Sequence, residues 1–350
     1  MSDVLVETDA SAKKRGVAVS SWNPADLEEV GACPVCGSST SSLMHDAVED
    51  WAFRSAPGRW RYWQCTECQS LYLNPRPTPA SIGLAYSSYY THEGPGSITG
   101  LKSLKLRWKN ERLSARFGRS IEPRLNLPGA IQSAVARRGR RMALPFGWEE
   151  LAAMNPGRLM DVGCGTGATV ALARQLGWDA QGIEMDSAAV EAAGKVGLEV
   201  HEGGYELLRE HTRAFDCITC SHVIEHVFDP VDMVRAIHAA LKPGGRLLLA
   251  TPNVKSDVHQ YFGRFWRGLE APRHLTMFTE ATLIALLQES GFIVDSRSDD
   301  QLETARESAR IARGGVHANS EDRALARQLR HSLKRTPEGQ DFIKLLACKA

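Results

Sequence analysis

The chain has 350 residues, a formal net charge of +1 and an ordinary apolar content of 43%. This length suffices for one large domain plus a smaller one, and the near-zero charge gives no whole-chain argument for a nucleic-acid partner. No apolar run reaches the 18 residues of a membrane-spanning helix. Residues 1–20 lack the apolar core of a secretion signal, so we expect a cytoplasmic protein.

Four cysteines in two tight pairs follow a polar stretch, residues 1–28, that we expect to be a disordered leader. Cys33 and Cys36 form the first Cys-x2-Cys pair, and Cys65 and Cys68 form the second. In a reducing compartment such pairs bind metal more often than they form disulfides. Four thiolates close a tetrahedral Zn²⁺ site and leave no open position, which predicts a structural zinc in a ribbon-like module over 29–80. The alternative is four unrelated buried thiols.

A basic region, 81–144, comes next, after an extended proline-rich linker over 74–79. Twelve Lys and Arg residues face two acidic residues between 101 and 141. Leu101, Leu104 and Trp108 recur at helical spacing, which predicts an amphipathic helix in the first half. It is either a solvated face or a contact for a phosphate-bearing acceptor, an anionic membrane surface or RNA. Tyr86, Tyr89 and Tyr90, which follow the linker, are expected to pack on the next domain or to wall a substrate pocket.

From Leu144 onward, apolar runs of strand length alternate with helical periodicity. This alternation predicts an α/β, Rossmann-like fold with a doubly wound, mostly parallel sheet, whose ligands bind at the carboxyl ends of the strands. The expected strands are 159–162, 180–184, 198–201, 215–220, 246–251 and 292–296, with a last strand over 341–348. The expected helices are 168–176, 187–195, 230–241 and 279–290, with a polar helical insertion over 306–333.

Carboxylate side chains and a glycine-rich loop lie at the ends of these strands. Asp161 lies inside the first strand end, ahead of glycines at 163, 165 and 167, which is not the spacing of a dinucleotide fingerprint. A carboxylate there would repel a pyrophosphate but suits a cationic amino group. Glu184 closes the second strand, where a carboxylate can accept both ribose hydroxyls of a nucleoside. These features favour an amino-acid-bearing nucleoside cofactor.

Four motifs in order, 161–167, Glu184, 215–226 and 241–245, resemble those of class I S-adenosylmethionine-dependent methyltransferases, most of all the ubiquinone-biosynthesis-like branch. The resemblance spans about 145–292 and implies a methyltransferase domain over 145–350. It implies that the glycines wrap the methionine portion, that Asp161 holds its amino group and that Glu184 holds the ribose. The expected cofactor-binding residues are Asp161, Gly163, Cys164, Gly165, Gly167, Glu184, Met185, Ser221 and His222.

A hydroxyl acceptor benefits from a general base. His226 is the first candidate by its resemblance to a catalytic histidine of related sugar enzymes; His274 is the runner-up and His222 is a further candidate. His222, Glu225 and His226 are a conceivable metal site. Arg273 is expected to bind an acidic group of the acceptor, with a packed lid over 271–278 as the alternative.

The cysteine module is similar to that of sugar methyltransferases acting on nucleotide-linked deoxysugars. Together these features predict an S-adenosylmethionine-dependent methyltransferase acting on a small-molecule hydroxyl or carbon acceptor: a sugar, a glycolipid precursor or a secondary metabolite. Two alternatives stay open. One is an RNA methyltransferase that uses the zinc module and the basic arm. The other is an interaction protein with a vestigial cofactor fold.

Overall fold

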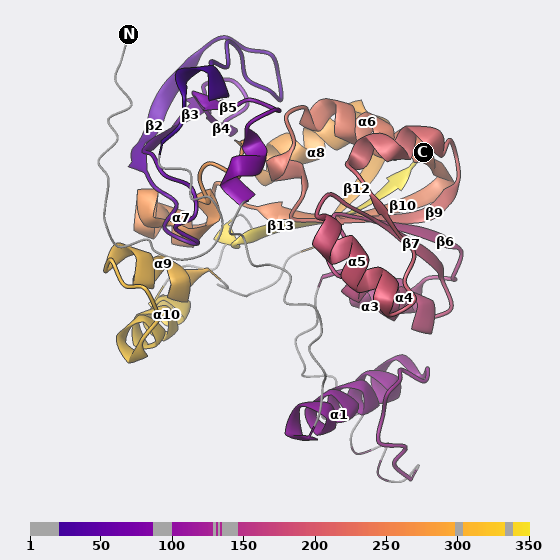
Figure 1. The fold of residues 1–350 in the computed structure, drawn as a ribbon. Coiled ribbons are helices and arrows are strands. Elements are labelled where there is room, and N and C mark those ends of the chain that lie inside the picture. The colour runs from indigo at the N-terminus through magenta and orange to yellow at the C-terminus, as the bar shows by residue number, and fades with distance from the viewer. Residues whose placement is uncertain are drawn as a thin grey trace. The chain divides into compact units, whose positions relative to one another are not determined.

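The computed structural model describes residues 21–86, 100–128, 131, 134, 146–297, 304–332 and 339–350 (Figure 1). These residues divide into two compact units. The first comprises the described parts of 1–90, 222–235 and 250–346, and the second comprises the described parts of 91–221, 236–249 and 347–350. The strands β10 (Leu241–Pro252) and β13 (Phe342–Lys349) each pass from one unit into the other.

A seven-stranded sheet runs in the order β12-β13-β10-β9-β6-β7-β8. With β6 as the first strand, this is the doubly wound order 3-2-1-4-5-6, with β13 inserted between the fifth and sixth strands. The pairs β6–β7, β6–β9 and β7–β8 are parallel. The remaining strands are β6 (Arg158–Val162), β7 (Asp179–Glu184), β8 (Val200–Glu202), β9 (Phe215–Ser221) and β12 (Phe292–Arg297). The predicted α/β fold class is confirmed.

Helices follow these strands as the periodicity predicted. In Figure 1, α4 and α5 run alongside the sheet; α4 contacts β6 and β7, and α5 contacts β7 and β8. The central strands are buried because their apolar runs, such as Leu159 to Val162, face helices on either side. The helices after β6 are α4 (Ala168–Gln175), α5 (Ser187–Lys195), α6 (Pro230–Ala240), α7 (Asp257–Phe262) and α8 (Glu280–Glu289), with α3 (Trp148–Ala153) before it.

The first unit contains a second sheet, in the order β11-β4-β3-β2. Its strands are β2 (Ser41–Val48), β3 (Trp60–Cys65), β4 (Leu71–Leu73) and β11 (Thr276–Met277). The last strand comes from the segment expected to form a lid, and it pairs with β4 through Thr276 opposite Tyr72. The Tyr62 hydroxyl donates to the carbonyls of Leu269 and His274, at 2.5 and 2.8 Å. The cysteine module therefore shares one sheet with residues more than 200 positions later.

Several boundaries differ from expectation. Residues 21–28 are not disordered: Trp22 is buried, and β1 (Leu27–Glu28) pairs with β5 (Arg76–Pro77), which places part of the expected linker in a sheet. The expected leader up to residue 20 lies outside the described residues. The strand β10 begins at Leu241, so residues 241–245, expected to lie before the strand at 246–251, belong to it, with Gly244 at a φ of 74°.

The basic region and the late insertion each contain helices among the described residues, although 118–128 and 313–319 are not helical. The helix α1 (Gly100–Phe117) ends at Gly118, whose φ of 66° is left-handed; most of the basic run after 128 lies outside the described residues. The expected polar insertion forms α9 (Ala305–Ala312) and α10 (Ser320–Ser332). Among the described residues, no helix is both long and apolar enough to cross a membrane.

Candidate functional site

The second unit holds a loop of three glycines between β6 and α4. Gly163, Gly165 and Gly167 have φ angles of 69°, 54° and 83°, a region that favours glycine. A Cβ on Gly167 would lie 2.6 Å from Leu198 Cδ1, so the third glycine also serves close packing of the loop. The backbone N–H groups of Gly163 and Cys164 donate to the Ile183 carbonyl, at 2.8 and 3.1 Å. The loop is thereby fixed to the end of β7.

Glu184 closes the other side of this loop. Its carboxylate accepts from the Gly165 N–H at 2.8 Å and from the Asp186 N–H at 2.9 Å. The side chain therefore stands at the carboxyl end of β7, directly beside the glycines. Met185, the next residue, is 75% exposed.

Asp161 is buried at the point where the strand order reverses, between β6 and β9. It stands opposite Thr219 in the register of these strands, and the Thr219 hydroxyl donates to Asp161 Oδ1 at 2.6 Å. Burial raises the pKa of the Asp161 carboxyl to about 7; the Thr219 hydrogen bond opposes this rise and the Glu184 carboxylate adds to it. A cation bound here would relieve that cost. Thr219 had no sequence signal apart from its register with Asp161.

Two further residues expected at the cofactor lie at this edge of the sheet. Cys164 is nearly buried, and burial with the nearby Asp161 raises the pKa of its thiol, so the thiol is protonated at neutral pH. Ser221 is the exposed last residue of β9. Within the second unit the structure therefore brings together Asp161, the glycine loop, Cys164 and Glu184 around the ends of β6 and β7.

The three candidate bases belong to the first unit, where His222 directly follows β9. His222 has a φ of 57°, and its Nδ1 lies 3.2 Å from Glu225 Oε1. Glu225 is fully buried, and the Thr251 hydroxyl donates to its other oxygen at 2.9 Å. Burial opposes ionisation of Glu225, but the hydrogen bond and charge of His222, with His226 and His274 nearby, hold the pKa of this carboxyl down to about 2.

His226 and His274 lie ring to ring, with centroids 4.6 Å apart and an edge-to-face angle of 81°. Burial, with the neighbouring His226, lowers the pKa of His274 to about 4, so this imidazole is neutral at pH 7. The His274 Nδ1–H donates to the Gly268 carbonyl at 2.7 Å. His226 is half-buried, and its Nδ1 lies 3.0 Å from the Tyr86 hydroxyl and 3.1 Å from the Arg273 carbonyl.

Arg273 does not lie where an acceptor could reach it. Its guanidinium is fully buried and pairs with both oxygens of Asp50 and with Glu270. The expectation that Arg273 binds an acidic acceptor group is therefore wrong, because its side chain is fully buried and both of these carboxylates belong to the first unit. Asp50 and Glu270 were missed, since nothing in the sequence connects Asp50 with a residue 223 positions later.

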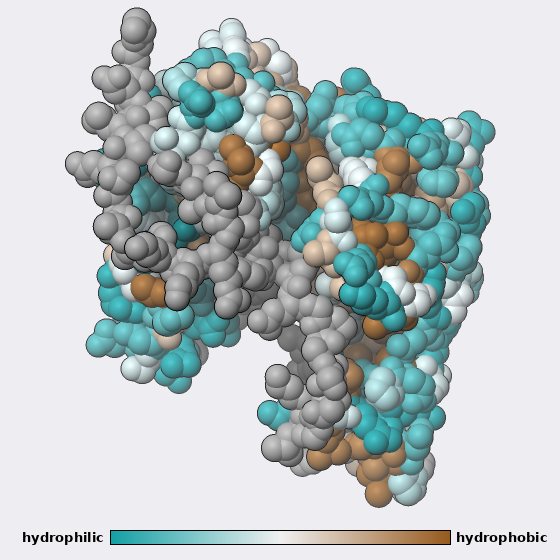
Figure 2. All heavy atoms as spheres, viewed as in Figure 1, coloured by the Kyte–Doolittle hydropathy of each residue, from teal (hydrophilic) through white to brown (hydrophobic). Residues whose placement is uncertain are grey.

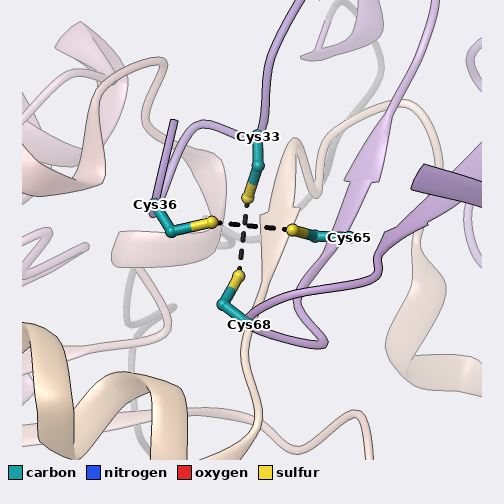
Figure 3. A group of neighbouring side chains, drawn as sticks. All are labelled: Cys33, Cys36, Cys65 and Cys68. Atoms are coloured by element: carbon teal, nitrogen blue, oxygen red, sulfur yellow. Dashed lines mark hydrogen bonds between the residues drawn. The ribbon is translucent and has the colours of Figure 1, made fainter. Parts of the chain in front are cut away.

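The four predicted cysteine ligands converge, and Figure 3 shows their sulfur atoms pointing to a common centre. The Sγ atoms of Cys33 and Cys68 are 3.6 Å apart, and those of Cys36 and Cys65 are 3.5 Å apart. A tetrahedron with Zn–S bonds of about 2.3 Å has edges of about 3.8 Å. These separations are close to that edge and far longer than the ~2.05 Å of a disulfide. The donor set therefore fits zinc.

The backbone repeats around both cysteine pairs. The Cys33 N–H donates to the Ser38 carbonyl, and the Gly37 N–H donates to the Cys33 carbonyl. The same two bonds join Cys65 with Ser70 and with Gln69. Gly37 and Gln69 both have a positive φ, 74° and 63°. Each pair is thus held in one knuckle geometry, which aims two thiols at a shared point.

A second group of metal-ligating side chains exists among the described residues. The ligand atoms of Glu225, His226 and His274 all lie within 4.8 Å of one another. This set differs from the expected metal site, because His274 takes the place of His222. Both Glu225 oxygens are already engaged by His222 and Thr251, which leaves this group better equipped for hydrogen bonding than for holding an ion.

Comparisons with known proteins agree with the geometry of the second unit. Residues 131–297 match a family described as "Methyltransferase domain". A ubiquinone biosynthesis O-methyltransferase of Xanthomonas oryzae pv. oryzae is 37% identical over 103 residues, which are 27% of this chain and 43% of that protein. One from Pseudomonas aeruginosa is 32% identical over 112 residues, 30% and 48% of the two chains. The chain thus spans about half the length of the curated relatives it matches.

Among solved structures, a methyltransferase from Thermotoga maritima, described as a possible histamine N-methyltransferase, overlaps with a TM-score of 0.40. It is 19% identical and covers 58% of this chain and 87% of its own. One from Archaeoglobus fulgidus has a TM-score of 0.41, 17% identity and coverages of 56% and 87%. Residues 131–297 therefore match the methyltransferase-domain family, and the strand order and the glycine loop agree with the predicted resemblance to class I S-adenosylmethionine-dependent methyltransferases.

Proposed function

We propose that the chain is an S-adenosylmethionine-dependent methyltransferase that methylates a hydroxyl group of a small-molecule acceptor. The observation that carries the cofactor assignment is Asp161. It is a buried carboxylate at the reversal of strand order, and among the described residues no basic side chain forms an ion pair with it. The bound cofactor supplies a methyl group made electrophilic by a cationic sulfur.

The residues of the second unit take the following roles in this proposal. Asp161 accepts from the cofactor's ammonium group, and Glu184 accepts from the ribose hydroxyls at the end of β7. The left-handed glycines let the backbone approach the methionine portion. Cys164, Met185 and Ser221 of this unit complete the proposed cofactor set, together with His222, the residue after Ser221, which belongs to the first unit.

His226 is the proposed general base, with His274 and His222 as the alternatives. A base positioned on the acceptor hydroxyl removes its proton as the oxygen–carbon bond forms. His274 is less suited, because its side chain is buried. His222 is engaged by Glu225. His226→Ala should lower kcat by roughly 10²- to 10⁴-fold, the usual contribution of such a group, and unchanged kcat at saturating substrate would exclude His226 as the base.

Calorimetry with S-adenosylmethionine tests the cofactor, and methyl transfer from the labelled cofactor to catechol or to a sugar nucleotide tests the acceptor. The O-methyltransferases among the relatives support an oxygen acceptor. We propose a sugar, a glycolipid precursor or a secondary metabolite, following the similarity of the cysteine module to that of sugar enzymes. Absence of cofactor binding would support the vestigial interaction protein instead.

We propose a structural zinc ion on Cys33, Cys36, Cys65 and Cys68. The ion would tie the two knuckles together and stabilise a module with a small core of its own. Metal analysis of the purified protein should find about one zinc per chain. Folded protein that contains no metal would exclude this proposal.

The helix α1 is the proposed contact with an anionic partner. Leu104 and Trp108, one turn apart, are 53% and 43% exposed, and they are accompanied by the exposed Lys105, Arg107 and Lys109. Figure 2 shows hydrophobic and hydrophilic residues side by side on the part of the face that α1 occupies, at the bottom of the view. This combination favours a membrane surface with acidic lipids.

Sedimentation with phosphatidylglycerol vesicles, but not with phosphatidylcholine vesicles, would support this contact. Binding to neither vesicle, with salt-dependent binding to RNA, would favour the RNA methyltransferase.

A further inference from the structure

The hydrogen bonds of His226 assign its tautomer. Its Nδ1 lies 3.1 Å from the Arg273 carbonyl oxygen and 3.0 Å from the Tyr86 hydroxyl. A carbonyl oxygen can only accept, so Nδ1 carries the proton and the Tyr86 oxygen serves as a second acceptor. The lone pair of the neutral ring then lies on Nε2. His226 is thereby held in one of its two neutral forms.

The Arg273 carbonyl is held in place by the Arg273 side chain. The guanidinium pairs bidentately with Asp50 and lies over the Phe53 ring, 4.8 Å from its centroid. Asp50 is itself held by the N–H groups of Phe53, Ser55 and Ala56, at 3.1, 2.8 and 3.1 Å. The turn after β2 therefore forms the binding site of the Arg273 guanidinium, and Asp50 supplies the negative charge of that site.

The same guanidinium also reaches the second neighbour of His226. Its Nη1 donates to the Ala85 carbonyl at 2.9 Å, and Ala85 immediately precedes Tyr86. One buried side chain thus anchors both groups that contact His226 Nδ1. Burying this ion pair costs desolvation free energy. The attraction between the charges offsets that cost only when the geometry is good and the hydrogen bonds are satisfied.

We propose that Arg273, clamped by Asp50, is the positioning residue of His226: it fixes the Nδ1–H tautomer and so presents Nε2 as the basic nitrogen. This inference rests on the proposed function, in which His226 is the base. It gives the N-terminal module a part in the chemistry, because Asp50 belongs to that module and Arg273 to the later segment. Both residues lie in the first unit.

The tautomer can be read directly by ¹⁵N–¹H NMR of protein labelled at histidine. The chain has 11 histidines, and the His226 signals are identified by their loss in His226→Gln. In the wild type, His226 should show the Nδ1–H form. Asp50→Asn should raise the ratio of Nε2–H to Nδ1–H by up to about tenfold, the worth of roughly one hydrogen bond. Tyr86→Phe, a milder change, should shift the ratio in the same direction.

Asp322→Asn is the matched control. Asp322 is 3% exposed and pairs with Arg313 at 2.8 Å, and its contacts among the described residues do not include His226. It should cost comparable stability and leave the His226 spectrum unchanged. An Nε2–H form in the wild type would overturn the inference. So would a ratio unchanged in both Asp50→Asn and Tyr86→Phe, or an equal shift in Asp322→Asn. If Asp50→Asn does not fold, Tyr86→Phe decides alone.

The spectrum needs neither cofactor nor acceptor, so this test and that of the proposed function can fail separately. Loss of S-adenosylmethionine binding in calorimetry would refute the function and leave the tautomer as it is. A wild-type Nε2–H tautomer with intact cofactor binding would refute only the positioning role.

Discussion

The buried carboxylate of Asp161 makes a quantitative prediction about cofactor affinity. Its pKa of about 7 in the free protein means that the group is partly protonated at neutral pH. A bound ammonium group favours the carboxylate form and lowers this pKa. Affinity for S-adenosylmethionine should therefore rise with pH up to about pH 7. At pH values below about 7 it should fall roughly tenfold for each pH unit, because each ligand molecule must displace a proton.

The size of the effect follows from two independent estimates. Restoring the pKa from about 7 to an ordinary value near 4 corresponds to about 4 kcal/mol, at 1.36 kcal/mol per pKa unit. Two unit charges 4 Å apart attract by about 4 kcal/mol at an effective dielectric constant of 20. The agreement indicates that a single ammonium contact suffices to ionise Asp161 in the complex.

Isothermal calorimetry at pH 5.5, 6.5 and 7.5, in pairs of buffers with different ionisation enthalpies, measures both the affinity and the released proton. S-adenosylhomocysteine, which keeps the amino group but lacks the sulfonium charge, should show the same slope. Asp161→Asn should bind weakly at every pH and lose the slope. A flat affinity profile in the wild type, with no proton released, would refute the assignment of Asp161 to the ammonium group.

Three other changes have defined outcomes. Gly167→Ala should lower the free energy of unfolding by about 1–3 kcal/mol, because its Cβ would meet Leu198 at 2.6 Å at a left-handed φ; an unaltered urea midpoint would contradict this. Cys65→Ser should lose the bound zinc and lower the melting temperature of the whole first unit, whereas Cys348→Ser, outside the cluster, should retain the metal. The folded pKa of His274, about 4, lies below its unfolded value of 6.5, so protonation favours the unfolded chain; stability should fall as pH drops from 6.5 to 4. His274→Phe should flatten that fall in urea titrations, and an equally steep fall would exclude His274 as its source.

The sequence was informative wherever local chemistry decides the structure. The strands β6, β7 and β9 and the helices between them were predicted to within about two residues, because apolar runs are punctuated by glycines and caps. The convergence of the four cysteines was predictable for the same reason, since each pair is a local turn. The cofactor roles of Asp161 and Glu184 stay predictions, but both residues lie where the strand ends were expected.

Long-range pairing was not predictable. Nothing in a two-residue strand such as β11 indicates that it pairs with β4, and nothing in the sequence around Asp50 indicates an ion pair with Arg273. Arg273 was assigned to the acceptor because the corresponding loop covers the acceptor in similar proteins. The leader was misjudged at residues 21–28 because its short strand is stabilised by a partner about 50 residues away, Arg76–Pro77. A single sequence carries no signal for such partners.

The shared sheet of the first unit limits how this protein can be shortened or recombined. A chain starting after residue 80 would lose the strand that β11 pairs with, and the carbonyls of Leu269 and His274 would lose the hydroxyl of Tyr62. Buried acceptors without donors cost about 1–3 kcal/mol each. The cysteine module therefore cannot be removed or exchanged on its own without destabilising the rest of the first unit. An exchange between homologues should move it together with the segment around 266–278, and hybrids that split the two should aggregate or fail to express.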